Sequence, residues 1–286
     1  MSTVTPLSPW IEILHPTGSR PVVLLCDHAG REVPEGLGFL GISERDLARH
    51  IGWDIGAAAV TRELAGLLDA TAVLCHTSRL LIDVNRRPGI ASSIPERVDG
   101  TEIPGNRDLS PAEVRRRIRR YWLPYHRTVA RVIGRLRRRG RTPAVIAVHS
   151  FTPRLNGEAR PWQIGILWRG DDRLSRPVLD ALSARGDLCI GDNRPYSGLE
   201  NFGYTIEFHA QRPRLPHLMI ELRQDCIAHP AEARKYAEIL AEVLAAPLAD
   251  PALYSPFEGD NLAELQARYG VGRIGWRHLA HLSRWA

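Results

Sequence analysis

The sequence predicts an α/β domain built around a mostly parallel β-sheet. Short apolar runs with the composition of buried strands alternate along the chain with segments of helical periodicity. These runs are almost continuously apolar, which is typical of parallel strands covered by helices on both faces. We therefore expect three layers, in which a mixed but mostly parallel sheet lies between two layers of helices.

The apolar runs and periodic segments give the expected order of elements. Strands are predicted at residues 22–26, 72–76, 79–84, 145–148, 164–168, 188–190 and 218–222, with a further short strand at 204–208. Helices are predicted at residues 54–68, 111–139, 172–185, 231–244 and 261–269. Pro111 behind Ser110 is a favourable helix start. Two long polar segments, 85–111 and 192–217, are either binding loops or disordered.

Length and composition indicate a soluble globular protein. The 286 residues show no sharp change of composition, so we expect one domain over 1–286, with 257–286 as a small helical appendage. No apolar run approaches the roughly 20 residues of a membrane helix, and the amino-terminal segment lacks the pattern of a signal peptide. The four cysteines are widely spaced, which suits reduced thiols. These features predict a cytoplasmic protein without membrane association.

The net charge of +6 raises the possibility of nucleic-acid binding. The positive charge is concentrated in arginine-rich runs at 115–120 and 135–141, which fall on one predicted helix. Nucleic-acid binding would call for interleaved aromatic side chains or a known module, and the sequence shows neither. We interpret the runs as a solvated helix face and expect no nucleic-acid partner. A metal-free structural or carbohydrate-binding protein is a further alternative.

Groups capable of chemistry stand at the ends of several predicted strands. In chain order they are Asp27, His28, Asn85, Arg86, His149, Ser150, Glu221 and Arg223. Ligands of open α/β sheets bind at the carboxyl ends of strands, so these groups predict an active site there. The motifs of nucleotide-binding loops, serine-hydrolase elbows and helical zinc proteases are absent from the sequence, which disfavours those enzyme classes.

His28 and His149 are the candidate metal ligands. Two histidines and one carboxylate, with one position left open, are a common ligand set for catalytic zinc. A carboxylate outside the metal shell is then needed as general base, and Glu221 is the candidate. The third ligand is left open by the residues alone. Asp54 is either a ligand or the cap of the following helix, and Glu32 is either a ligand or a solvated loop residue.

Several segments of the chain, in their order and spacing, resemble the N-formylglutamate amidohydrolase family. They are CDHAG…VP, HIGWDIGAAAVTREL, SRLLIDVNRRP, AVHSFTP and LPHLMIELRQD. The resemblance covers roughly residues 21–245. Because that family is similar in fold to the zinc-dependent exopeptidases, the resemblance implies their phosphorylase/hydrolase-like sheet.

The resemblance also implies a metal centre. Zinc or another divalent metal would be held by His28, Asp54 and His149, and Glu221 would be the general base. Asp54 is preferred to Glu32, because the exopeptidase glutamate falls at Arg31 in this sequence and WDIGA belongs to the family pattern.

The implied reaction is hydrolysis of an N-formyl or other short N-acyl amino acid, a small-molecule substrate. N-formyl-L-glutamate, cleaved to formate and L-glutamate in histidine degradation, is the substrate that the resemblance favours. Asn85 and Arg86, supported by Arg79, would hold the α-carboxylate, since arginine matches both carboxylate oxygens. Arg223 or His209 would hold a side-chain carboxylate. The alternative is an amidohydrolase or carboxypeptidase-like enzyme for another N-acyl amino acid or a short peptide. The oligomeric state is not predicted.

Overall fold

A central sheet of seven strands organises the computed structural model, which describes residues 6–199 and 203–259. Across the sheet the order is β1 (Ile11–Leu14), β3 (Thr71–Cys75), β2 (Val22–Cys26), β6 (Ala144–Phe151), β11 (His217–Arg223), β9 (Ile164–Leu167) and β10 (Ile190–Asp192). Strands β3, β2, β6 and β11 are parallel to one another. Strands β1 and β9 run antiparallel to their neighbours β3 and β11. The sheet is therefore mixed, with a parallel centre.

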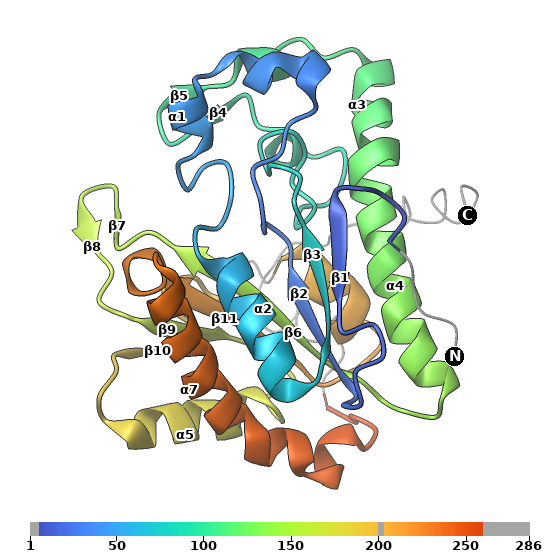
Figure 1. Ribbon diagram of the computed structural model, residues 1–286, viewed down its shortest axis with the longest axis vertical. Coiled ribbons are helices and arrows are strands. Elements are labelled where there is room, and N and C mark those ends of the chain that lie inside the picture. Colours follow the sequence, from blue (N-terminus) through green and yellow to red (C-terminus); the bar gives the residue numbers. More distant parts are fainter. Residues whose placement is uncertain (1–5, 200–202, 260–286) are drawn as a thin grey trace.

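Helices cover both faces of this sheet (Figure 1). One face carries α2 (Ala57–Leu68), α5 (Ser175–Arg185) and α7 (Pro230–Ala249), and the other carries α4 (Leu123–Arg138) and α6 (Tyr204–Ile206). Successive side chains of a strand point to opposite faces. In β2, Val22 and Leu24 join the apolar cluster of α2, α5 and α7, while Val23 and Leu25 join the cluster of α4. This arrangement confirms the predicted fold class and explains why β2 is apolar at every position.

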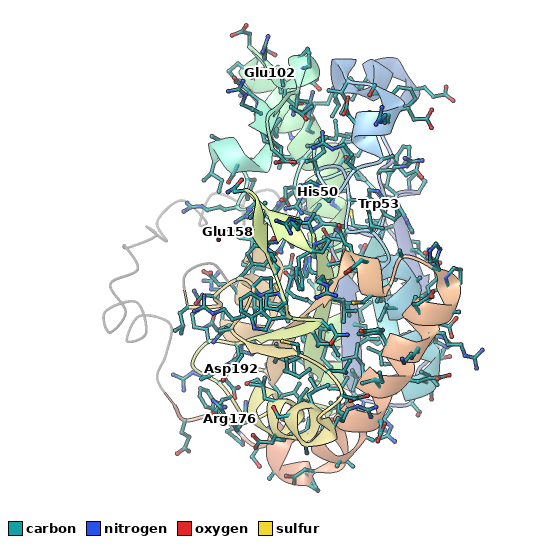
Figure 2. All side chains as sticks on the ribbon, turned by 90° about the vertical axis from the view of Figure 1, so that its left-hand side faces the viewer. His50, Trp53, Glu102, Glu158, Arg176 and Asp192 are labelled. Carbon is teal, nitrogen blue, oxygen red and sulfur yellow. The ribbon has the colours of Figure 1, made fainter. Side chains whose placement is uncertain are left out.

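Shorter elements complete the described chain. The 3-10 helices are η1 (Glu35–Gly41), η2 (Ala91–Ser93), η3 (Pro104–Asn106), η6 (Gln224–Cys226) and η7 (Pro251–Tyr254), and α1 spans Glu44–Leu47. Two hairpins consist of β4 (Arg97–Val98) with β5 (Thr101–Glu102) and β7 (Arg154–Leu155) with β8 (Glu158–Ala159). The segment with α1, β4 and β5 lies at the top of Figure 1, above the sheet. In Figure 2, Glu102 lies at the top, whereas Arg176 and Asp192, an ion pair of 3.4 Å, lie in the lower half.

Two of the predicted strands are wrong. Residues 79–84 form turns, in which the backbone N–H groups of Leu81 and Ile82 both donate to the carbonyl of Ser78. The run is apolar because it is buried, and burial alone does not distinguish a strand from a packed turn. Residues 204–208 begin α6 and continue into a π-helix, η5 (Glu207–Gln211). The apolar pattern also failed to predict β1, a four-residue edge strand.

The predicted helix 111–139 forms, but in three parts. These are α3 (Pro111–Arg117), a π-helical turn η4 (Ile118–Trp122) and α4. Ser110 caps the start, because its Oγ accepts a hydrogen bond of 3.2 Å from the backbone N–H of Glu113. Arg117 departs from the predicted solvated face, since it is buried and donates to the carbonyl of Leu81 and to Oδ1 of Asn106.

Two further predictions concern parts of the chain beyond the sheet. The helix predicted at 261–269, and the appendage from residue 260 onwards, lie outside the described residues. No helix within the described ranges is both long enough and apolar enough to cross a membrane.

Two buried histidines pack between α4 and η5. The rings of His126 and His209 stack with centroids 5.2 Å apart. Nε2 of His126 donates to the carbonyl of Val84 at 2.9 Å, so its Nδ1 accepts from Nε2 of His209, also at 2.9 Å. This chain of bonds requires the ring of His126 to be neutral, because its Nδ1 must accept. Burial lowers the pKa of His126 to about 4, and burial together with His126 lowers that of His209 well below its ordinary value.

We predict that this pair makes the protein less stable below pH 6.5. The unfolded chain protonates both histidines near their ordinary pKa of 6.5, whereas the folded protein does not. The free energy of unfolding from the pair is therefore fully present above pH 6.5 and falls as the pH drops toward 4. Urea unfolding at pH 7.5, 6.5, 5.5 and 4.5 measures the slope.

The control is His209→Gln, which keeps an N–H donor at that position but removes the titrating group. Its slope below pH 6.5 should be shallower than that of the wild type by up to about 1.4 kcal/mol per pH unit, the value for one proton. Equal slopes in the two proteins would contradict the burial of a neutral His209.

Candidate active site

The candidate site lies at the carboxyl edge of the parallel strands, as the strand-end groups predict. His28 follows β2, His149 lies near the end of β6, and Glu221 lies near the end of β11. Glu221 and His149 are direct neighbours in the register of the two strands. Asp54, which comes just before α2, completes the group. All four side chains are at least 94% buried, since their exposed fractions are 2%, 3%, 6% and 3% for His28, Asp54, Glu221 and His149.

One oxygen of Asp54 is shared by both histidines. Oδ2 of Asp54 lies 3.2 Å from Nδ1 of His28 and 2.8 Å from Nδ1 of His149. One ligand atom from each of the three residues lies within 4.8 Å of the other two. Two imidazole nitrogens and a carboxylate oxygen that converge in this way form a donor set that could hold a divalent metal.

The outer nitrogen of each histidine is held by a further carboxylate. Nε2 of His28 lies 2.8 Å from Oδ1 of Asp83, and Nε2 of His149 lies 3.1 Å from Oδ2 of Asp27. Tyr125 donates to the other oxygen of Asp27 at 2.6 Å. A carboxylate behind the imidazole fixes the tautomer and the ring orientation, and it is the usual second partner of a metal-bound histidine. Each histidine of the donor set therefore has the carboxylate partner that is typical of a metal-bound histidine.

The local backbone explains why Asp54, rather than Glu32, reaches the histidines. The N–H of Asp54 donates to the carbonyl of His28 at 3.0 Å, which ties the turn to the end of β2. Gly56 begins α2 at φ +82, where a Cβ would lie 2.4 Å from the carbonyl oxygen of Ile227. No side chain caps this helix, so the carboxylate of Asp54 serves the histidines instead. Glu32 is exposed and belongs to a backbone bridge with Thr77.

The charges of the site favour positive charge at the imidazoles. Burial and Arg79 lower the pKa of His28, but Asp83 and Asp54 outweigh them and raise it. Burial likewise lowers the pKa of His149, and Asp27 and Asp54 raise it well above its usual range. Burial would raise the pKa of Asp54, yet the two histidines hold it well below the ordinary value. Three buried carboxylates around two imidazoles suit a bound cation.

Glu221 is the carboxyl group of the site that is left without a partner. Within the described part of the chain, its Oε2 is buried and makes no hydrogen bond. Burial raises its pKa to about 7, against the attraction of His149. A buried polar atom without a partner is costly, which is typical of functional groups that act on a ligand.

These groups border a cavity of about 420 Å³. Its lining is His28, Asp54, Arg79, Asn85, Arg86, His149, Leu167, Arg194, Pro195, Tyr196, Ser197, Gly203, Met219 and Glu221. Arg79 is already paired with Asp54 at 3.3 Å and with Asp83 at 3.2 Å. Arg86 lies farther from Asp83, at 3.9 Å. The cavity thus combines the donor set, Glu221 and guanidinium groups in a space suited to a small anionic molecule.

Three successive carbonyls hold the segment that carries Asn85 and Arg86. The carbonyl of Val84 accepts from Nε2 of His126 at 2.9 Å, that of Asn85 from the N–H of Tyr204 at 3.0 Å, and that of Arg86 from Nε1 of Trp122 at 3.0 Å. We call these three bonds the carbonyl clamp. They come from α4, α6 and η4, so the helices of one face fix the backbone that presents these side chains to the cavity.

Asn85 has a second role in this arrangement. Its Oδ1 accepts from the N–H of Thr205 at 3.1 Å, at the start of α6. The same side chain also borders the cavity. The side chain therefore joins the helix to the site.

Two residues expected to bind substrate do not border the cavity. His209 stacks on His126 instead. Arg223 binds Asp225 at 2.7 Å and the carbonyl of Pro161 at 2.9 Å. Arg194 and Tyr196 border the cavity but were not singled out from the sequence, because they lie within a long segment with no strand-end pattern. The only feature of the sequence that pointed to these two residues was the unusual length of the segment that contains them.

Comparison with known proteins identifies the family. A family model for N-formylglutamate amidohydrolase matches residues 20–228. A solved structure of a gene product of Agrobacterium tumefaciens shares 35% sequence identity with this chain and superposes with a TM-score of 0.81. The match covers 84% of this chain and 94% of that one. An N-formylglutamate amidohydrolase from Ralstonia eutropha is 20% identical, with a TM-score of 0.65 and coverage of 83% of this chain and 96% of that one; it shows the same fold. Among the curated proteins, none matches the chain. The chain belongs to the N-formylglutamate amidohydrolase family, whose members are hydrolases that act on an amide bond.

Proposed function

We propose that the protein is a metal-dependent amidohydrolase that cleaves N-formyl-L-glutamate to formate and L-glutamate. The observation that carries this proposal is the convergence of Nδ1 of His28 and Nδ1 of His149 on Asp54, beside Glu221, whose Oε2 has no hydrogen-bond partner among the described residues. The family match supports the reaction class. Direct measurement of formate release from N-formyl-L-glutamate, before and after chelation, tests the proposal.

His28, Asp54 and His149 would hold the metal through two nitrogens and one oxygen. That donor set suits zinc, and their carboxylate partners Asp83 and Asp27 would keep both Nδ1 atoms free of protons. A bound zinc ion lowers the pKa of water and polarises a carbonyl group.

Glu221 would move the proton that the reaction transfers. Hydrolysis forms a bond from the water oxygen to the carbonyl carbon and breaks the bond from that carbon to nitrogen. The carboxylate of Glu221 would take a proton from the attacking water and pass it to the leaving nitrogen. Glu221 borders the cavity, and its buried Oε2 makes no hydrogen bond within the described residues, so the carboxylate is not committed to a structural partner through that oxygen.

The arginines of the cavity would bind the carboxylates of the substrate. Asn85 and Arg86, held by the carbonyl clamp, would grip the α-carboxylate. Arg79 is balanced by Asp54 and Asp83 and would support the site rather than bind directly. Arg194, which borders the cavity whereas His209 and Arg223 do not, would meet the second carboxylate of a glutamate-like substrate.

A second cavity beside the first supports an alternative to N-formyl-L-glutamate, namely a longer substrate. It has a volume of about 620 Å³ and shares Arg79 and Arg86 with the first. An N-acyl dipeptide whose second residue extends past Arg86 would use both spaces. A panel of N-formyl amino acids, N-acetyl amino acids and N-formyl dipeptides distinguishes the two substrates.

We predict that His28→Ala and Glu221→Gln separate metal binding from turnover. Removing His28 deletes a ligand, so the variant should lose both bound zinc and activity. Glu221→Gln keeps the shape of the side chain but cannot accept a proton, so zinc content should stay near that of the wild type while kcat falls at least about 100-fold. Metal analysis of the purified proteins and steady-state kinetics provide the readouts. Full activity of Glu221→Gln would contradict its assignment.

We predict that Arg86→Ala chiefly raises KM. Loss of a charge-assisted, two-pronged contact with the substrate carboxylate should raise KM by about 10- to 100-fold with a smaller effect on kcat. Arg87→Ala is the matched control, because Arg87 is the next residue but does not border the cavity. If kcat fell while KM stayed constant in Arg86→Ala, the role in holding the carboxylate would be wrong.

A further inference from the structure

Tyr196 enters the cavity from the segment that follows β10. Its side chain borders the same space as Glu221 and Arg79. Tyr196 is 41% exposed, so it borders the cavity while remaining partly open to solvent.

A buried arginine holds the hydroxyl of Tyr196. NH1 of Arg160 donates to its Oη at 3.1 Å, and the guanidinium lies 4.9 Å from the centroid of the tyrosine ring. Arg160 is only 8% exposed, and its guanidinium also lies 5.8 Å from the ring centroid of Phe151. Such a combination of hydrogen bond and ring contact restricts both the position of the ring and the direction of the hydroxyl.

The backbone of Arg160 is fixed in turn. Its N–H donates to the carbonyl of Pro153 at 2.9 Å, and its carbonyl accepts from NH1 of Arg223 at 3.3 Å. Arg223, predicted from the sequence to bind substrate, thus contacts the backbone of Arg160. Arg160 in turn contacts Tyr196, and Tyr196 borders the cavity.

The hydrogen of the Tyr196 hydroxyl is left to donate to a ligand. Arg160 occupies one lone pair of Oη, and within the described residues no acceptor is recorded for the hydroxyl hydrogen. A charged donor on the oxygen strengthens the bond that the same hydroxyl donates onward. Partial burial and Glu221 raise the pKa of Tyr196 despite Arg160, so the phenol keeps its proton at neutral pH.

We propose that Tyr196 is a catalytic residue whose hydroxyl donates a hydrogen bond to the carbonyl oxygen of the scissile amide as that oxygen gains negative charge. This inference rests on the proposed amide hydrolysis. When the water oxygen adds to the carbonyl carbon, the π electrons move to the carbonyl oxygen, and they return when the bond to nitrogen breaks. Tyr196 keeps its proton throughout. Because the bond strengthens only as charge develops, it lowers the barrier rather than improving substrate binding.

The test compares Tyr196→Phe with Tyr254→Phe. Both changes remove one hydroxyl and keep the ring, but Tyr254 lies in η7 and donates to the carbonyl of Leu248, outside the cavity lining. Kinetics are measured on the N-acyl amino acid or dipeptide that the wild type hydrolyses fastest within the panel, so a wrong guess of substrate does not affect the comparison. We expect kcat of Tyr196→Phe to fall roughly 100-fold. Its KM and zinc content, and all values for Tyr254→Phe, should stay within about threefold of the wild type.

Arg160→Met tests the positioning role of the arginine. If Arg160 acts through Tyr196, the single variant should lose kcat, and Arg160→Met combined with Tyr196→Phe should be no slower than Tyr196→Phe alone. Additive losses would mean that Arg160 acts independently. Unchanged kcat in Tyr196→Phe would overturn the proposal, as would a raised KM with unchanged kcat, which indicates ground-state binding. Failure of the wild type on every member of the panel would instead overturn the proposed function itself, and this inference with it.

Discussion

The site depends on one shared oxygen, Oδ2 of Asp54, on which Nδ1 of His28 and Nδ1 of His149 converge. The two histidines come from the ends of adjacent parallel strands, so the sheet alone brings them close. Asp54 comes from the start of a helix on one face and closes the group from outside the sheet. A carboxylate between two buried imidazoles is stable only with compensating charge, and a divalent metal at that point would satisfy all three groups.

The substrate end of the cavity depends on a different constraint, the carbonyl clamp. Residues 84–86 lie beyond any strand. The N–H groups of Asn85 and Arg86 donate to Asp83, and the clamp holds the same segment through its carbonyls. Two π-helical turns, η4 and η5, lie beside the clamp, and such turns are frequent at functional sites because they widen a helix locally. Here η4 supplies Trp122, which holds the backbone of Arg86. The metal end is thus supported by the sheet and the arginine end by the helices of one face.

The sequence predicted the parts of this site that depend on strand ends. An apolar run that stops at a histidine marks both the strand and its functional end, which is why His28, His149 and Glu221 could be grouped from the order of residues alone. Arg79 and Arg86 also border the cavity, although their segment is a buried turn rather than a strand. His209 and Arg223 could not be placed, because their contacts are set by tertiary packing of η5 and of the segment near Pro161. Tyr196 and Arg194 were missed because they lie in a long connecting segment. Such a segment has no hydrophobic periodicity from which the direction of its side chains can be predicted.

The most direct test of the central claim is a crystal structure of the zinc-loaded protein, with anomalous diffraction measured at the zinc edge. The account predicts one strong anomalous peak bound by Nδ1 of His28, Nδ1 of His149 and a carboxylate oxygen of Asp54, with Asp83 and Asp27 still on the two Nε2 atoms. A peak bound through Nε2 of either histidine, a peak at Glu32 in place of Asp54, or no peak in crystals grown with excess zinc would contradict it.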